Sequence, residues 1–495
     1  MSALIGEEAL GNWRRVRQYA VPRRMIERAT AARLAGDWRA ACAAAGVVVE
    51  PGEAELAPFA DDLLHFAPDL LRWHLPRRPG RGETTIAPRN LVILARRGDS
   101  LLGVGTPRVG FGSQRLVLVA CEEIDEDRFP GSYDWSAARH RWDAREADRL
   151  AERTCGPNAT QILALQDAGQ TQQAWADAGI DVPDPPDAAR KDFARFDADP
   201  HRVLAAARAG RTATFSVTVS GRFDLRLHLV NGGPVHSEWV RARSWTRPAS
   251  PDRLDYLAVQ RPVDLHLVRT GLLSPADLHP LVGPQLAPFA AAARIPVVRR
   301  DDVVRVRCGG QWHAVGWESA RLAIPHDADE RRREEALRAL GGTLHGCFAA
   351  AEGWADRADR LPRRLEEQRR DLLLRMMHGD LDGVVERLDA GMDPRARDVH
   401  GRTLLHLIAG VDWCEGWPDL LARLLAAGLD LEARDHAGRT PLHLAVHQDG
   451  SPQVVGALLD AGADPHAEDA QGWSLADLYD RRRADDLPQL RGFFS

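Results

Sequence analysis

The sequence predicts a multidomain protein, with an N-terminal α+β region containing antiparallel β-hairpins and a C-terminal α-helical solenoid built from repeats. Three observations support this fold class. The length of 495 residues exceeds one typical core and suggests roughly two to four domains. Within the first part of the chain, several segments alternate apolar and polar residues around glycine-containing turns. Near the C-terminus, the phrase GRTLLHLIA at 401–409 returns as GRTPLHLAV at 438–446.

Residues 1–80 are predicted to form a helical subregion. Arginine-rich and alanine-rich stretches alternate there, and Gly36 and Gly46 are expected to end helices. The first 40 residues hold eight arginines and four acidic residues. A basic helix-turn-helix that binds nucleic acid is one interpretation of this pattern. The solvated face of a helical hairpin is the favoured one.

Residues 81–352 are predicted to form an α+β domain of unknown function. The domain begins with three candidate strands, NLVILARR, SLLGVGTPRVG and QRLVLVACEEI. A polar stretch over about 125–210 is expected to be helical. Two later segments are predicted hairpins, because strand-like alternation flanks Ser220-Gly221 and Gly309-Gly310.

The sequence lacks residues that the common motifs for catalysis and nucleotide binding require. A dinucleotide fingerprint that starts at Gly103 needs glycine where Arg108 stands. A phosphate loop that starts at Gly105 needs lysine after Gly110, where the chain has Phe111. HExxH and GxSxG do not occur. We therefore expect no catalytic residue and no bound cofactor. An enzyme with its active site in the N-terminal domain, and the repeats as a targeting or regulatory arm, stays an alternative.

The six cysteines are spread along the chain without a CxxC or another short metal spacing. We interpret them as reduced, buried side chains of a cytoplasmic protein, so no metal ligand is predicted. The most apolar stretch, LAPFAAAARIPVV, is short and contains Arg294, so no membrane partner is expected. Lys191 is the only lysine, and this bias toward arginine indicates a GC-rich, bacterial coding sequence.

A charged linker over residues 353–364 is predicted to join the two parts. The surrounding sequence, EGWADRADRLPRRLEEQRR, is rich in charged residues, and Pro362 interrupts any helix through it. Beyond the linker, residues 376–495 carry a net charge of −10. This acidity argues against a nucleic-acid partner, because phosphate backbones bind clustered cations.

Glycines mark a regular unit in residues 365–495. Each unit ends in Ala-Gly, and the glycine of the next turn follows ten residues later every time. The intervals between successive Ala-Gly glycines are 37 and 34 residues, so the variation falls in the helical half of the unit. The three pairs of glycines are Gly391 and Gly401, Gly428 and Gly438, and Gly462 and Gly472.

The best copy of the unit has a physical reason for each residue type. Thr440 can cap a helix, and Pro441 suits the first helical position. Leu442 begins a slim apolar face, and the sequence VVGALLDAG supplies the second helix. This segment resembles ankyrin repeats, with about three repeats and a degenerate C-terminal cap over 365–495. It departs from that family where Leu404 replaces the preferred proline and where VDWCEGWPD is inserted.

The resemblance implies a binding function. In ankyrin repeats the histidine at the positions of His406 and His443 generally belongs to an internal hydrogen-bond network. Contacts with a protein partner commonly come from the turn tips. We therefore expect a protein-protein interaction or scaffold protein whose partner is of unknown identity. The turn positions that match are Val399, His400, Arg402, His436, Ala437, Arg439 and Trp473.

Overall fold

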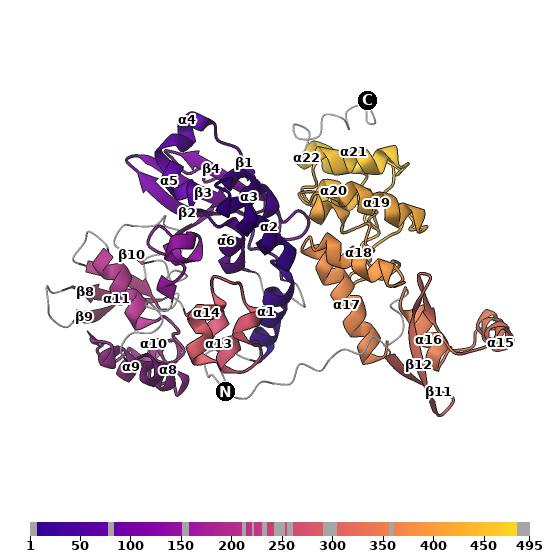
Figure 1. The fold of residues 1–495 in the computed structure, drawn as a ribbon, viewed down its shortest axis with the longest axis horizontal. Helices are drawn as coiled ribbons and strands as arrows, with labels where there is room; N and C mark the ends of the chain where they lie inside the picture. The colour runs from indigo at the N-terminus through magenta and orange to yellow at the C-terminus, as the bar shows by residue number, and fades with distance from the viewer. Residues whose placement is uncertain are drawn as a thin grey trace. The chain divides into compact units, whose positions relative to one another are not determined.

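A computed structural model gives the fold of the protein and divides the chain into two compact units (Figure 1). The N-terminal unit comprises Met1–Gly110 and Arg115–Val297, and the C-terminal unit comprises Phe111–Gln114 and Val298–Ser495. The structure describes residues 7–77, 84–150, 158–209, 214–219, 222–229, 235–241, 253–254, 261–290, 304–355 and 361–482.

The division between the units differs from the expected linker at 353–364. It falls after Val297, so residues 304–352 belong with the repeats. The reason is the core of the C-terminal unit, because Val304, Trp354, Leu365 and Leu372 all belong to one buried apolar cluster. Residues 356–360 of the expected linker lie outside the described residues.

Helices dominate the start of the chain, as predicted. Gly36 and Gly46 follow helix ends with φ values of 79° and 66°, in the left-handed region that glycine adopts without strain. The strand β1 was not predicted. The elements are α1 (Glu7–Tyr19), α2 (Arg23–Leu34), α3 (Trp38–Ala44), β1 (Val47–Val49), α4 (Glu53–Leu56), α5 (Ala60–Leu64) and α6 (Pro68–His74).

The first sheet has five strands in the order β1-β4-β3-β2-β5. Its centre consists of the three predicted strands, paired antiparallel, while β1 pairs with β4 and β5 with β2 in parallel. The sheet is therefore mixed: the predicted antiparallel strands form its centre, and the two parallel edge strands were not predicted. The further strands are β2 (Asn90–Arg97), β3 (Ser100–Gly105), β4 (Leu116–Cys121) and β5 (Gly131–Asp134).

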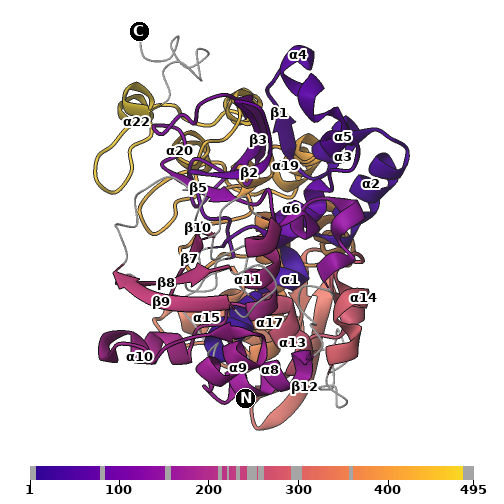
Figure 2. The ribbon, with the colours of Figure 1, turned by 90° about the vertical axis from the view of Figure 1, so that its left-hand side faces the viewer.

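The second sheet is also mixed, in the order β10-β7-β8-β9-β6. Its longer strands β8 and β9 lie side by side in Figure 2. Phe215, Val217, Leu225 and Leu227 are buried on one face, which confirms the alternation around the predicted hairpin. The turn Ser220-Gly221 itself lies outside the described residues. The strands are β6 (Ile180–Asp181), β7 (Thr214–Thr218), β8 (Phe223–His228), β9 (Val235–Arg241) and β10 (Arg253–Leu254).

The remaining helices of the N-terminal unit come before and after the strands of the second sheet in the chain. Within the stretch 125–210 that was expected to be helical, β5 and two short 3-10 helices come first, and the described α-helices begin at Ala159. The helices are α8 (Ala159–Asp167), α9 (Thr171–Asp177), α10 (Asp187–Ala194), α11 (Pro200–Ala209), α13 (Val263–Arg269) and α14 (Gly283–Leu286).

A buried ion pair joins α1 to α13. Arg17 Nε donates to Asp264 Oδ1 at 2.6 Å, and Arg17 Nη2 donates to Asp264 Oδ2 at 2.9 Å. The two side chains are 3% and 0% exposed. Trp73 Nε1 also donates to Asp264 Oδ2, at 3.4 Å. The pair is bidentate, so both carboxylate oxygens accept a hydrogen bond from Arg17.

The C-terminal unit begins with a three-stranded antiparallel sheet in the order β11-β12-β13. Its predicted hairpin is confirmed, because Cys308 pairs with Gln311 across Gly309 and Gly310, whose φ values are 57° and 85°. Positive φ at both turn residues is typical of a two-residue hairpin turn. The elements are β11 (Val304–Cys308), β12 (Gln311–Glu318), β13 (Arg321–Ala323), α15 (Ala328–Ala339) and α16 (Gly346–Gly353).

The repeat helices follow one another from orange to yellow in Figure 1. In the second copy, the first half forms only turns and a 3-10 helix over Ile408–Val411, where Leu404 and the insertion depart from the pattern. The part of the chain that the structure describes has no helix with the length and apolarity needed to cross a membrane. The helices are α17 (Arg363–Met377), α18 (Leu381–Asp389), α19 (Trp417–Ala426), α20 (Pro441–His447), α21 (Pro452–Asp460) and α22 (Leu475–Arg482).

Candidate functional site

The turns that precede each helical half share one hydrogen-bond arrangement. Asp398 Oδ1 accepts hydrogen bonds from the backbone N–H groups two and four residues later, at 2.8 and 2.9 Å. Asp435 does the same at 2.8 and 2.9 Å, and Asp469 at 2.8 and 3.1 Å. An aspartate that binds its own following backbone fixes a turn locally. The three turns therefore have the same shape.

Successive turns are also joined to one another. His436 N donates to His400 O at 2.8 Å, and Ala470 N donates to Ala437 O at 2.9 Å. Gly438 permits this approach, because a Cβ added there would lie 2.5 Å from Ala470 N. Its φ of 74° independently favours glycine. The turns thus form a continuous row.

His406 links the second and third copies from inside the unit. Its Nδ1 accepts from Thr403 N at 3.1 Å, so Nε2 carries the proton and donates to Arg439 O at 3.0 Å. His443 Nδ1 likewise accepts from Thr440 N, at 3.4 Å, and lies 2.8 Å from Thr440 Oγ1. Burial lowers the pKa of both histidines, that of His406 to about 4. Both imidazoles are therefore neutral inside the unit, and His406 bridges the second and third copies.

Comparison with known protein families agrees with this geometry. Residues 372–469 match the family model of ankyrin repeats, in three copies. The C-terminal part of the chain consists of ankyrin repeats. No curated protein matches the chain. The ankyrin histidines His406 and His443 occupy the internal positions that the resemblance implied.

Protonation of the ankyrin histidine should weaken the repeats at low pH. Folding lowers the pKa of His406 from 6.5 to about 4. As the pH drops from 6.5 toward 4, the histidine therefore takes up a proton in the unfolded chain but not in the folded one, and the free energy of unfolding decreases. We expect His406 to account for a loss of about 2 kcal/mol in the free energy of unfolding between pH 7 and pH 5. Urea unfolding of His406→Asn should lack this part of the pH dependence. The exposed control His466→Asn should retain it, and equal pH dependence in all three proteins would contradict the assignment.

The seven predicted partner-binding residues differ in their accessibility. Val399, His400 and His436 are exposed, whereas Ala437, Arg439 and Trp473 are half-buried. Arg402 departs from the exposed position that we expected. It is only 5% exposed, because its guanidinium turns back to Asp398 Oδ2, with Nε 2.6 Å away. The other six side chains are therefore wholly or partly accessible along the row of turns.

A recess lies beside this row, within the C-terminal unit. Its volume is about 610 Å³, and we call it the basic recess. Of the predicted residues, only His436 lines it. The ionic residues around it are three arginines and one carboxylate. The lining consists of Arg338, Ala351, Glu352, Ala355, Arg395, Arg397, Gly401 and His436.

The arginines of the basic recess were not among the residues predicted from the sequence. Arg338 forms an ion pair with Glu352, and Arg395 Nη2 lies 2.9 Å from Asp393 Oδ2. Arg397 Nη1 instead donates to two backbone carbonyls, Gly401 O at 2.7 Å and Arg434 O at 2.9 Å. A signal was available, since the tripeptide Ala-Arg-Asp occurs at 396–398 and again at 433–435. The repeated arginine, Arg397 in one copy and Arg434 in the next, donates a hydrogen bond to a backbone carbonyl of the following turn.

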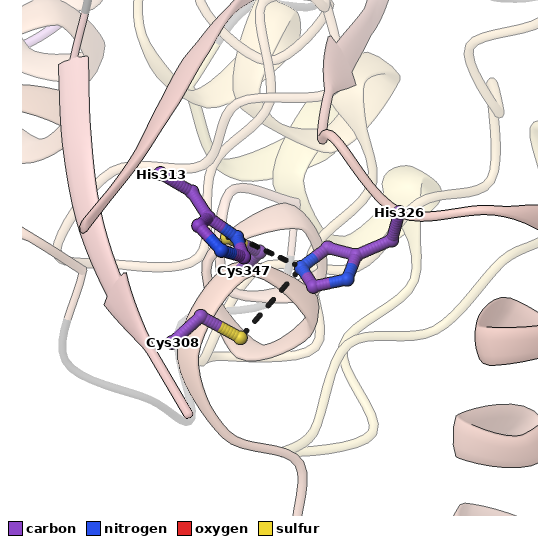
Figure 3. A group of neighbouring side chains, drawn as sticks. All are labelled: Cys308, His313, His326 and Cys347. Carbon is purple, nitrogen blue, oxygen red and sulfur yellow. Dashed lines mark hydrogen bonds between the residues drawn. The ribbon is translucent and has the colours of Figure 1, made fainter. Parts of the chain in front are cut away.

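A second group of side chains converges near the start of the C-terminal unit (Figure 3). The ligand atoms of Cys308, His313, His326 and Cys347 all lie within 4.8 Å of one another. Burial and the neighbouring Cys308 thiol raise the pKa of Cys347 to about 12. No metal ligand was predicted from the sequence, because the four residues span 40 positions without a short spacing. One signal was available: the predicted hairpin places Cys308 and His313 on the same face of its two strands.

Proposed function

We propose that the chain is a protein-binding protein that holds its partner along the ankyrin turns and in the basic recess. Ankyrin repeats support protein-protein interaction in general. The observation that carries the finer proposal is the position of His436, which belongs both to the row of turns and to the lining of the recess. The proposed surface continues along the turns through Val399, His400, Ala437, Arg439 and Trp473.

The charge of the basic recess favours an acidic segment of the partner. The side chains of Arg338 and Arg395 are 61% and 52% exposed, so both guanidinium groups reach solvent. Glu352 is 26% exposed and is the one carboxylate in the lining. Arginine binds carboxylates with two parallel hydrogen bonds, which gives both affinity and orientation. A partner that presents aspartate or glutamate fits this lining.

The two alternatives have less support among the described residues. Nucleic-acid binding would use the arginines of the first helices, but Arg17 is buried against Asp264 and Arg39 forms an ion pair with Glu53. An enzyme would need accessible acid-base groups. The buried pair of His279 Nε2 and Asp69 Oδ2, 3.1 Å apart, is 1% and 2% exposed.

We also propose a cytoplasmic location, which the free cysteines of the described residues favour.

Cross-linking tests the proposed surface. A photoreactive phenylalanine analogue at His436 should capture partner proteins from a lysate of the source cells, and the captured peptides should be rich in aspartate and glutamate. The same analogue at His466 is the matched control, because that histidine is also exposed but does not line the recess. Equal yields and identical proteins at the two positions would contradict the proposal.

Charge reversal tests the role of the arginines. Adding Arg338→Glu and Arg395→Glu to the His436 probe should lower the capture yield at least about tenfold, because two exposed cations become anions. The melting temperature should change little, since both side chains are exposed. Arg332→Glu, an exposed substitution on the same helix outside the recess, should leave capture unchanged. Loss of capture in that control would indicate a nonspecific charge effect.

A further inference from the structure

We propose that Cys308, His313, His326 and Cys347 bind one zinc ion in a closed structural site. The four residues come from separate places in the fold (Figure 3). Cys308 ends β11, His313 lies on β12, His326 follows β13, and Cys347 lies in the first turn of α16. A shared ion would therefore connect every element of this small region except α15.

The distances between the ligand atoms match a tetrahedral zinc site. Cys308 Sγ lies 3.6 Å from His326 Nε2, and Cys347 Sγ lies 3.5 Å from His313 Nδ1. His313 Nδ1 and His326 Nε2 are 3.2 Å apart. In a tetrahedral site, zinc lies about 2.3 Å from sulfur and about 2.05 Å from nitrogen. These bond lengths place a nitrogen and a sulfur ligand about 3.6 Å apart, and two nitrogen ligands about 3.3 Å apart. The four atoms thus surround a space of the size of one zinc ion.

A carboxylate orients one of the histidines. His326 Nδ1 lies 3.1 Å from Glu330 Oε2, so Nδ1 donates its proton and Nε2 is left with a lone pair that faces the other three ligands. Glu330 is held in turn by Asp327 N, which donates to the same oxygen at 3.2 Å. A carboxylate behind the distal nitrogen is the usual second layer of a zinc-binding histidine. This arrangement is an observation independent of the four ligand distances.

The backbone is shaped to bring the two cysteines together. Gly346 precedes Cys347 with a φ of 59°, and a Cβ added to Gly346 would lie 2.6 Å from Cys308 Sγ. Any other residue would therefore push the start of α16 away from β11. Cys347 itself is fully buried, which keeps its thiol next to the other ligands.

The chemistry of the four ligands indicates which metal ion binds and what role it has. Two sulfurs and two imidazole nitrogens favour zinc over magnesium or calcium, which prefer oxygen ligands. Four protein ligands complete a tetrahedron and leave no position for a substrate or a water molecule, so the site is structural and not catalytic.

The zinc-binding region packs against the first helix of the repeats. Trp317 Nε1 donates to Gln368 Oε1 at 3.0 Å, and the Trp317 ring lies 4.3 Å from that of Trp354. Arg369 Nη1 donates to Gly353 O at 3.0 Å. Repeat stacks need a terminal element that covers the apolar face of the first unit. The zinc therefore stabilises an N-terminal cap of the ankyrin stack.

Metal analysis of the full-length protein tests the site. Protein purified under reducing conditions without chelator should contain one equivalent of zinc. Cys308→Ser and Cys347→Ser should each reduce the content to less than about one tenth of an equivalent. Cys121→Ser is the matched control, because Cys121 is a half-buried cysteine of the N-terminal unit, and this variant should keep one equivalent.

A milder variant separates metal binding from folding. Glu330→Gln leaves all four ligands in place and should weaken zinc affinity about 10–100-fold, measured by competition with a chromogenic chelator. Cobalt added to the metal-free protein should give the absorption of a tetrahedral thiolate site. Folded, reduced protein that takes up less than about one tenth of an equivalent of zinc or cobalt would overturn the proposal.

Discussion

Asp264→Ala is expected to lower the free energy of unfolding by about 3–5 kcal/mol, because it leaves the Arg17 guanidinium buried without its anion. Arg17 would keep one hydrogen bond, from Nη1 to Trp73 O at 2.6 Å, which does not neutralise the charge. Guanidinium denaturation of the full-length protein, followed by tryptophan fluorescence, measures the loss. Trp73 lies next to the pair, with Arg17 Cζ 4.7 Å from the centre of its ring.

Two controls distinguish the lost pair from a general effect. Asp187→Ala removes a carboxylate whose side chain is 96% exposed, and it should change the free energy by less than about 0.5 kcal/mol. The double variant Arg17→Met with Asp264→Leu removes both charges and should recover most of the stability. A double variant as unstable as Asp264→Ala would mean that packing, and not the unpaired charge, causes the loss.

Leu442→Ala should destabilise the ankyrin repeats by about 2–5 kcal/mol, because it opens a cavity in the best-formed helix pair. Leu442 is 1% exposed and belongs to the apolar cluster of the C-terminal unit. It follows Pro441 on α20, whose cap is complete, so the helix itself should persist. Urea unfolding of the full-length variant, followed by circular dichroism, measures the loss in the transition of the repeats.

The matched control for this variant is Leu337→Ala, which shortens a leucine that is 49% exposed. It should shift the free energy of unfolding by less than about 0.5 kcal/mol. An unchanged midpoint for Leu442→Ala would show that α20 and α21 do not pack as described.

Local sequence patterns were sufficient for the elements whose signals lie close together in the chain. Thr440 and Pro441 begin α20, and Gly309 with Gly310 forms the hairpin turn, as predicted. The short strands β1, β5, β6 and β10 could not be predicted in the same way. Each has two to four residues and pairs in parallel with a distant strand, so no alternation develops and only the assembled sheet defines it.

The candidate sites were predictable to different degrees for a similar reason. His436 is marked by the repeat itself, whereas Arg338 reaches the basic recess from a helix outside the repeats. Of the zinc ligands, the hairpin brings Cys308 and His313 together, but His326 and Cys347 arrive only when the chain has folded back. A search for short spacings therefore misses the site.

The aspartates of the three turns have a consequence for how this protein can change during evolution. Asp398, Asp435 and Asp469 hold each turn through backbone N–H groups, so the shape of the turn does not depend on which side chains follow. Substitutions at exposed positions such as His400 and His436 can then change the chemistry of this surface at little cost in folding. A library randomised at these positions, with the aspartates kept, should therefore consist largely of folded proteins with different turn surfaces.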